Sequence, residues 1–289
     1  MPTLYVVATP IGNLQDMSPR AVATLRSVAL IAAEDTRVTM RLCQVFDIHT
    51  PLTSCHQHNE ESKGAQLAER MLAEQIDMAL TTDAGTPCVS DPGYQLVAAA
   101  VERGIEVQPV PGCCAGVSAL SVSGFDAREW AFYGFLPRER KALRDKLLAM
   151  ARGVPVAIVH ESPFRVVELM EQLQEVLPAC RVSVSCDLTK LHEKTIRGTA
   201  QEVLDQLRAN PKAEKGEYCL VLDFRAVTLP EEKPQTAQIS LEAQLTEKLL
   251  AGMGLREAQE ALILDGCRKN AVKAAALHLK RLLEEDEDE

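Results

Sequence analysis

Continuous apolar runs alternate with helical segments over the first 110 residues, and this alternation constrains the fold more than any other feature. The apolar runs cover residues 4–8, 28–33, 78–82 and 106–110. The helical segments cover residues 20–27, 36–46, 59–73 and 93–102. An apolar run without polar alternation is typical of a strand that is buried on both faces. Strands that alternate with helices predict a mostly parallel, doubly wound α/β domain, here over residues 1–124.

The pattern changes after residue 125, where the strands are expected to pair in a more antiparallel way. Further strands are predicted at 155–160, 181–187, 195–198 and 217–224, with helices at 162–176 and 200–207. We interpret residues 125–228 as a second α/β domain. A proline-rich and charged linker follows, then a helical extension over 236–283 that is broken near 252–254 and 266, and an acidic tail over 284–289.

Composition narrows the class of protein. The nine cysteines are odd in number and include no CxxC pair, which favours reduced thiols in a cytoplasmic protein over a disulfide framework. The amino terminus resembles a first strand rather than a signal peptide, and no apolar run reaches the length of a membrane span. The net charge is −10, of which the tail supplies six charges, so a local basic patch and RNA binding remain allowed.

Polar and glycine-rich turns follow the predicted strands, where open α/β sheets bind their ligands. The turns cover residues 8–14, 34–37, 54–60, 82–93 and 109–124. The turn at 82–93 is the most distinctive, because two glycines, two prolines and two aspartates build a rigid loop with many exposed backbone groups. None of the turns carries a GxGxxG, P-loop or GxSxG pattern.

Simpler explanations exist for several of these turns. Gly12 can serve an ordinary βα turn, and Asp35 or Thr36 can cap the helix that follows. His56 and His58 would point to opposite faces of an extended segment, so we predict no metal site and expect Asn59 to cap the next helix.

Taken together, these turns resemble the tetrapyrrole methylase superfamily, and more narrowly its RNA-modifying branch. The resembling stretches are 4–21, 33–37, 56–60, 82–93, 109–124, 132–137, 160–165 and 215–217. The resemblance implies two α/β domains, a homodimer, and S-adenosylmethionine bound in the cleft between the domains. It also implies 2′-O-methylation of a cytidine in 16S ribosomal RNA. Because the chain is acidic, we expect weak affinity for free RNA and predict the assembled small ribosomal subunit as the substrate.

The resemblance also assigns residues to the cofactor. The implied contacts are Pro10, Asp83, Thr86, Cys114, Ala115, Leu136 and Gly216. One position departs from the family pattern: Cys113 follows Gly112 where a proline is usual, which puts the rigidity of this turn in question.

Candidate residues for catalysis and RNA binding follow from their place beside the expected cleft. Glu34, Arg37, His58 and Glu161 are the catalytic candidates, and Arg20, Arg37 and Arg165 are the candidates for contacts to the RNA. Two alternatives stay open: methylation of a tetrapyrrole or another small molecule, and a cofactor-binding or RNA-binding protein without catalysis.

Overall fold

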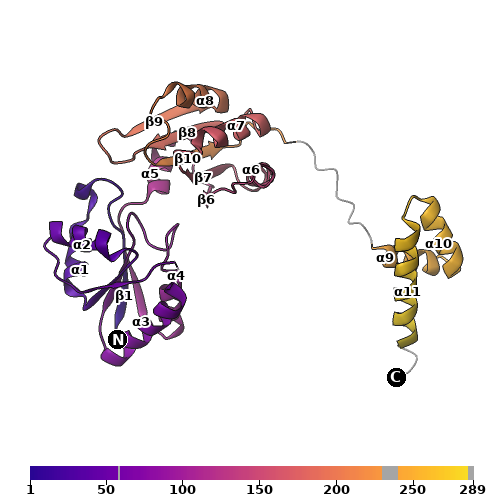
Figure 1. Ribbon diagram of the computed structural model, residues 1–289, viewed down its shortest axis with the longest axis horizontal. Coiled ribbons are helices and arrows are strands. Elements are labelled where there is room, and N and C mark those ends of the chain that lie inside the picture. Colours follow the sequence, from indigo (N-terminus) through magenta and orange to yellow (C-terminus); the bar gives the residue numbers. More distant parts are fainter. Residues whose placement is uncertain (58, 230–239, 286–289) are drawn as a thin grey trace. The chain divides into compact units, whose positions relative to one another are not determined.

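The computed structural model describes residues 1–57, 59–229 and 240–285. For residues 282–285 it describes the backbone alone. The chain divides into two compact units, Met1–Leu229 and Pro230–Glu289 (Figure 1). The predicted linker after residue 229 and residues 286–289 of the predicted acidic tail lie outside the described residues, whereas residues 284–285 of that tail belong to the last helix. None of the described helices is long and apolar enough to cross a membrane.

The first sheet of the larger unit is parallel throughout, as the continuous apolar runs predict. Its strands, in spatial order, are β3 (Leu52–Ser54), β2 (Leu30–Ala33), β4 (Met78–Thr81), β1 (Thr3–Val7) and β5 (Glu106–Val110). The sequence did not predict β3, because three residues are too few for a periodic signal. Parallel pairing brings all five carboxyl ends to one edge of the sheet.

Helices cover both faces of this sheet, which confirms the doubly wound class. They are η1 (Leu14–Asp16), α1 (Pro19–Ser27), α2 (Thr36–Val45), α3 (Glu60–Glu74) and α4 (Tyr94–Glu102). Alternate residues of the strands face opposite helices: Val7 and Ile31 are buried in the cluster that includes residues of α1 and α2. Leu4, Met78 and Leu80 are buried in the cluster that includes residues of α3 and α4.

The second sheet is mixed, as the sequence predicts. Its spatial order is β6 (Ala131–Phe135), β7 (Val156–Glu161), β10 (Tyr218–Asp223), β8 (Arg181–Cys186) and β9 (Lys194–Thr199). Only β6 and β7 pair in parallel. The sequence pattern did not indicate β6 or the helix that follows it. The two sheets belong to one compact unit, so the boundary between residues 124 and 125 remains a prediction.

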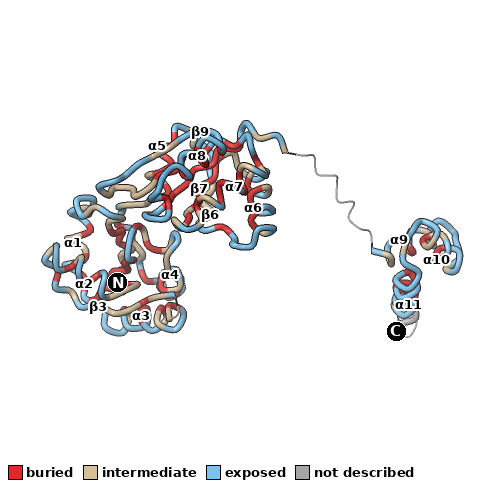
Figure 2. The backbone as a smooth tube through the Cα atoms, turned by 45° about the horizontal axis from the view of Figure 1, so that its top comes forward, coloured by how far each residue is buried: buried red, intermediate tan, exposed pale blue. Residues whose placement is uncertain are grey.

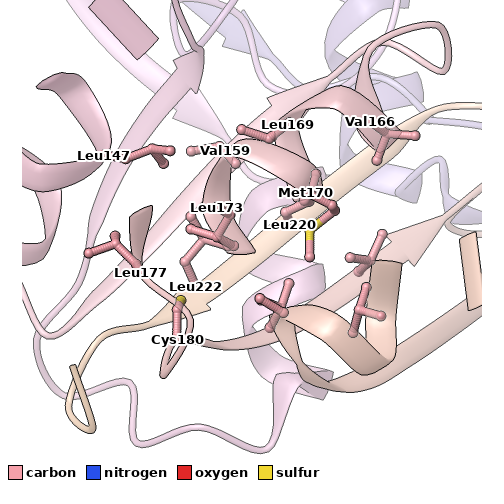
Figure 3. Close-up of a cluster of buried hydrophobic side chains, with 14 of the residues drawn as sticks. Leu147, Val159, Val166, Leu169, Met170, Leu173, Leu177, Cys180, Leu220 and Leu222 are labelled. Carbon is pink, nitrogen blue, oxygen red and sulfur yellow. The ribbon is translucent and has the colours of Figure 1, made fainter. Parts of the chain in front are cut away.

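The second sheet is also covered on both faces. Its helices are α5 (Ala115–Ser123), α6 (Arg140–Gly153), α7 (Val166–Val176) and α8 (Ala200–Ala209). Leu147, Leu169 and Leu173 pack on Val159 and its neighbours, as Figure 3 shows. On the other face, α5 packs against β7 and β10. Figure 2 shows the result, with buried segments in the strands and exposed segments on the outer helices.

The smaller unit holds three described helices, as the pattern over 240–283 predicts. They are α9 (Leu241–Leu250), α10 (Leu255–Leu264) and α11 (Lys269–Glu285). Leu245, Leu262 and Val272 are fully or almost fully buried in a core of their own. The predicted breaks are confirmed, since Gly252 and Gly266 take positive φ angles of 89° and 93° after the first two helices.

Helices α3 and α4 cross closely at Gly64, and this contact provides a test of the packing. A β-carbon added to Gly64 would lie 2.9 Å from the backbone nitrogen of Leu96. We expect Gly64→Ala to lower the free energy of unfolding by about 1–3 kcal/mol. The measurement is urea unfolding followed by the fluorescence of Trp130, the single tryptophan.

Gly153→Ala is the matched control, because the added methyl group meets nothing closer than 3.9 Å. Its free energy of unfolding should equal or slightly exceed that of the parent protein. Equal stability of the two variants would contradict the close crossing at Gly64.

Candidate functional site

A pocket of about 320 Å³ opens at the edge where the parallel strands end. Turns of the first sheet supply Ile11, the segments 84–86 and 89–91, and the segment 114–116. The second half of the unit supplies Phe132, Phe135, the segment 160–163, Leu188 and the segment 217–219. This volume suits a small organic ligand, and both halves of the unit contribute to it.

Backbone pairing joins the turns after β1 and β4. The N–H of Thr9 donates to the carbonyl of Gly85 at 2.9 Å, and the N–H of Gly85 donates back to Thr9 at 3.0 Å. Gly85 takes a φ of +89°, which favours glycine. The hydroxyl of Thr9 also donates to the carbonyl of Thr82 at 3.1 Å. These hydrogen bonds join the two turns into one side of the pocket.

The turn after β5 is tied to the same side of the pocket, despite the absence of the usual proline. The hydroxyl of Thr86 donates to the carbonyl of Cys113 at 2.9 Å. A β-carbon on Gly112 would lie 2.9 Å from the β-carbon of Ala8, so this turn passes close to β1. The predicted contacts Thr86, Cys114 and Ala115 all line the pocket.

An acidic group lies between the ends of β2 and β4. The carboxylate of Glu34 accepts from the Thr82 hydroxyl at 2.6 Å and from the Asp83 N–H at 3.2 Å. The carboxylate of Asp83 accepts from the N–H of Asp35 at 3.1 Å. Asp91 lines the pocket beside this group; burial, and then the charges of Glu34 and Asp83, raise its pKa to about 6. Burial and the charge of Glu34 also raise the pKa of Asp83.

The simpler explanation holds for Asp35, which caps α2. Its carboxylate accepts from the backbone N–H of Arg37 at 2.8 Å and pairs with the guanidinium of Arg37 at 2.6 Å. These bonds hold the pKa of Asp35 at about 2. The side chain of Arg37 is 84% exposed and does not line the pocket. The structure therefore does not bring this catalytic candidate to the pocket.

Glu161 does reach the pocket, from the end of β7. One carboxylate oxygen accepts from the N–H of Ser162 at 2.8 Å, and the other lies 3.4 Å from the guanidinium of Arg165 with no hydrogen-bond partner in the described chain. Burial raises the pKa of Glu161. Arg165 also donates to the carbonyl of Pro137 at 3.1 Å, so it ties the turns after β6 and β7 together.

Two predicted cofactor contacts lie outside the pocket wall. The side chain of Leu136 is buried in the core of the second sheet, and its carbonyl accepts from Arg165 at 3.5 Å. Gly216 has a φ of +92° and faces the carboxylate of Asp187. The residues directly after Gly216 line the pocket instead. Each is the direct sequence neighbour of a residue that lines the pocket, Phe135 and Glu217, and its contact with the cofactor remains a prediction.

Pro10 and Asp83 line a second cavity of similar volume, which lies against α2. This cavity shares the turns after β1 and β4 with the pocket but is lined by other residues of those turns, such as Thr9 and Thr82. Neighbouring residues of one turn can therefore face different cavities.

Arg20 and Asn59 do not line the pocket, and His58 lies outside the described residues. Arg20 is exposed and donates to the carbonyl of Pro109 at 3.3 Å. Asn59 occupies the cap position of α3, but its side chain accepts from the N–H of His56 at 2.8 Å and not from the helix.

Glu60, which the sequence did not single out, holds the end of the loop over residues 82–93. Its side chain is buried, and one oxygen accepts from the N–H of Gly93 at 2.6 Å. A glutamate in the first turn of a helix is common, so the sequence carries no signal for this tertiary contact.

Removing this acceptor should loosen the loop. We expect Glu60→Ala to lower the free energy of unfolding by about 1–3 kcal/mol, because the buried N–H of Gly93 loses its partner. Glu60→Gln keeps an acceptor oxygen and should lose clearly less. Urea unfolding followed by Trp130 fluorescence compares the two, and equal losses would argue against the hydrogen bond as the cause.

The chain is similar in sequence to a known family and to several of its named members. The sequence model of the family Tetrapyrrole (Corrin/Porphyrin) Methylases matches residues 3–204. Ribosomal RNA small subunit methyltransferase I of Bacillus subtilis (strain 168) is 40% identical, covering 96% of this chain and 90% of that protein. The protein of the same name from Pseudomonas aeruginosa is 41% identical, covering 95% of this chain and 96% of the relative.

Solved structures agree in fold. The methyltransferase CobJ matches with a TM-score of 0.57 at 16% identity, covering 80% of this chain and 97% of that chain. Uroporphyrin-III C-methyl transferase from Thermus thermophilus, complexed with S-adenyl homocysteine, matches with a TM-score of 0.52 at 17% identity, covering 77% and 97%. At these identities the likeness establishes the fold alone.

Proposed function

The chain belongs to the tetrapyrrole methylase family, and from that premise we propose that it transfers a methyl group from S-adenosylmethionine to the 2′-oxygen of a cytidine in 16S ribosomal RNA. The observation that carries the proposal is near-full-length similarity, at about 40% identity, to proteins named for methylation of small-subunit ribosomal RNA. The pocket at the strand ends supports it with a suitable volume and suitable chemistry.

The pocket suits a cofactor that carries positive charge beside apolar parts. Asp91 and Glu161 line it, and a buried oxygen of Glu161 is available as an acceptor. Gly85 and Gly116 keep the backbone accessible, and Ile11 adds an apolar surface. When bound, S-adenosylmethionine supplies a methyl group on a positively charged sulfur, which an oxygen lone pair can attack.

The residues of this chain then have to orient a ribose hydroxyl and accept its proton. A hydroxyl is a weak nucleophile, so an acceptor of suitable basicity accelerates the transfer. Asp91 is the best candidate, because its pKa of about 6 leaves it mostly ionised at neutral pH. Glu34 acts as a positioning residue through Thr82 and Asp83.

Other parts of the sequence prediction remain proposals. Arg165, held by Glu161 at the pocket, is a candidate for a phosphate contact, and the exposed side chains of Arg20 and Arg37 are others. We also infer action in the cytoplasm, a homodimeric state and the assembled small subunit as substrate. The overall charge of −10 supports the last point, because it limits the affinity for free RNA.

The elevated pKa of Asp91 predicts the pH dependence of the reaction. The ionised form is present above the pKa and is lost as the pH falls through about 6, so kcat/KM should fall about tenfold per pH unit below that value. Single-turnover methyl transfer at a series of pH values measures this dependence. Asp91→Asn should lower the rate about 10²–10⁴-fold. It should also abolish the fall in kcat/KM below pH 6, the acidic limb of the pH profile.

Glu34→Gln is the companion variant. It removes a negative charge that raises the pKa of Asp91 but keeps an acceptor for Thr82. The acidic limb should move to lower pH. An acidic limb that is unchanged in Asp91→Asn would rule out Asp91 as the proton acceptor.

The function itself is tested with labelled S-adenosylmethionine and small ribosomal subunits from a strain that lacks the enzyme. After digestion, mass spectrometry identifies the modified nucleoside. We expect 2′-O-methylcytidine. Label on a base, or turnover only with a tetrapyrrole, would overturn the proposal.

A further inference from the structure

Two phenylalanine rings are exposed on neighbouring turns beside the pocket. Phe135, at the end of β6, is 65% exposed and also lines the pocket, where its ring lies 5.9 Å from that of His160. Phe164, in the turn after β7, is 78% exposed. β6 and β7 are parallel neighbours with Phe135 opposite His160, so both turns leave the sheet at the same end.

The turns that carry these rings are held in place. The guanidinium of Arg165 donates to the carbonyls of Leu136 and Pro137 in the first turn and pairs with the buried carboxylate of Glu161 in the second. Arg165 is itself largely buried, with 20% of its side chain exposed. These contacts restrain the two turns that carry the rings. The protein therefore loses less conformational entropy when a flat ligand packs on the rings.

A basic segment follows β6 in the sequence, in contrast to the net charge of the chain as a whole. Residues 138–146 contain five basic and two acidic side chains, within a protein of net charge −10. Arg138 is exposed and lies close enough to Glu161 for its charge to act on that carboxyl. Exposed aromatic rings beside guanidinium groups are the features by which proteins hold unpaired nucleotides.

We propose that Phe135 and Phe164 form a stacking platform for unpaired nucleotides of the RNA substrate. Phe135 packs against the nucleotide that enters the pocket, and Phe164 stacks on a neighbouring base outside it. Arg138 and Arg165 contact the phosphates between them. The inference rests on the proposed function and deepens it, because it makes a single-stranded or unstacked target a requirement of the site.

Direct binding tests the platform independently of methylation. The probe is a short, unstructured, fluorescent RNA oligonucleotide, compared with the same sequence as a perfect duplex, and the readout is anisotropy at fixed salt. The full-length protein should prefer the single strand. Phe164→Ala should weaken its binding about tenfold, while Phe164→Trp keeps it. Cofactor affinity, measured by calorimetry, should be unchanged in both Phe164 variants.

Val101→Ala is the matched control. Val101 is 61% exposed on α4, near the end of that helix that leads into the start of β5, so it lies at the opposite edge of the first sheet. Removing its side chain should leave RNA binding unchanged. Equal loss in Val101→Ala and Phe164→Ala, or single-strand binding by Phe164→Ala within twofold of the parent protein, would overturn the platform.

The same variants separate this inference from the proposed function. If Phe164→Ala methylates small subunits with an unchanged KM, the stacking platform is contradicted while the proposed function is retained. Single-strand binding that depends on Phe164, without methylation of any ribosomal RNA, would support the platform and sink the function. A lower sedimentation mass for Phe164→Ala would assign the ring to a contact between two copies of the chain and overturn the platform.

Discussion

The parallel pairing of β1 with both β4 and β5 is the constraint on which the site depends. Parallel strands deliver their carboxyl ends to one edge, so turns that are far apart in sequence meet there. The reciprocal hydrogen bonds between Thr9 and Gly85 join two of these turns, and the Thr86 hydroxyl joins the third through the Cys113 carbonyl. Three turns that are joined by hydrogen bonds therefore form this side of the pocket, and the sheet positions them.

Charge is concentrated where this side of the pocket meets β2. Burial, and then the charges of Glu34 and Asp83, raise the pKa of Asp91 to about 6. Hydrogen bonds from Thr82 and from backbone N–H groups stabilise the negative charges of Glu34 and Asp83. Such an arrangement favours a cation in the pocket and provides a proton acceptor near neutral pH. Both properties agree with methyl transfer from a sulfonium to a hydroxyl.

The second half of the unit completes the pocket from a different kind of sheet. β7 ends in the buried Glu161, and Arg165 links the turns after β6 and β7. The core of this half, formed by α6, α7 and α8 on one face of the sheet, keeps both turns rigid. The exposed rings of Phe135 and Phe164 stand on this base, beside a basic segment. The cofactor side and the RNA side of the proposed reaction therefore share one edge.

Local patterns in the sequence determined the α/β class, most strands and helices, the cap at Asp35 and the turns that build the pocket, because periodicity and turn chemistry act over a few residues. Tertiary structure decided which residues of those turns face the pocket. The side chain of Leu136 is buried in the core, and Pro10 and Asp83 line a second cavity. Asp91 lines the pocket itself. Neighbouring residues of a turn point in different directions, and only packing between distant segments selects which of them faces the pocket.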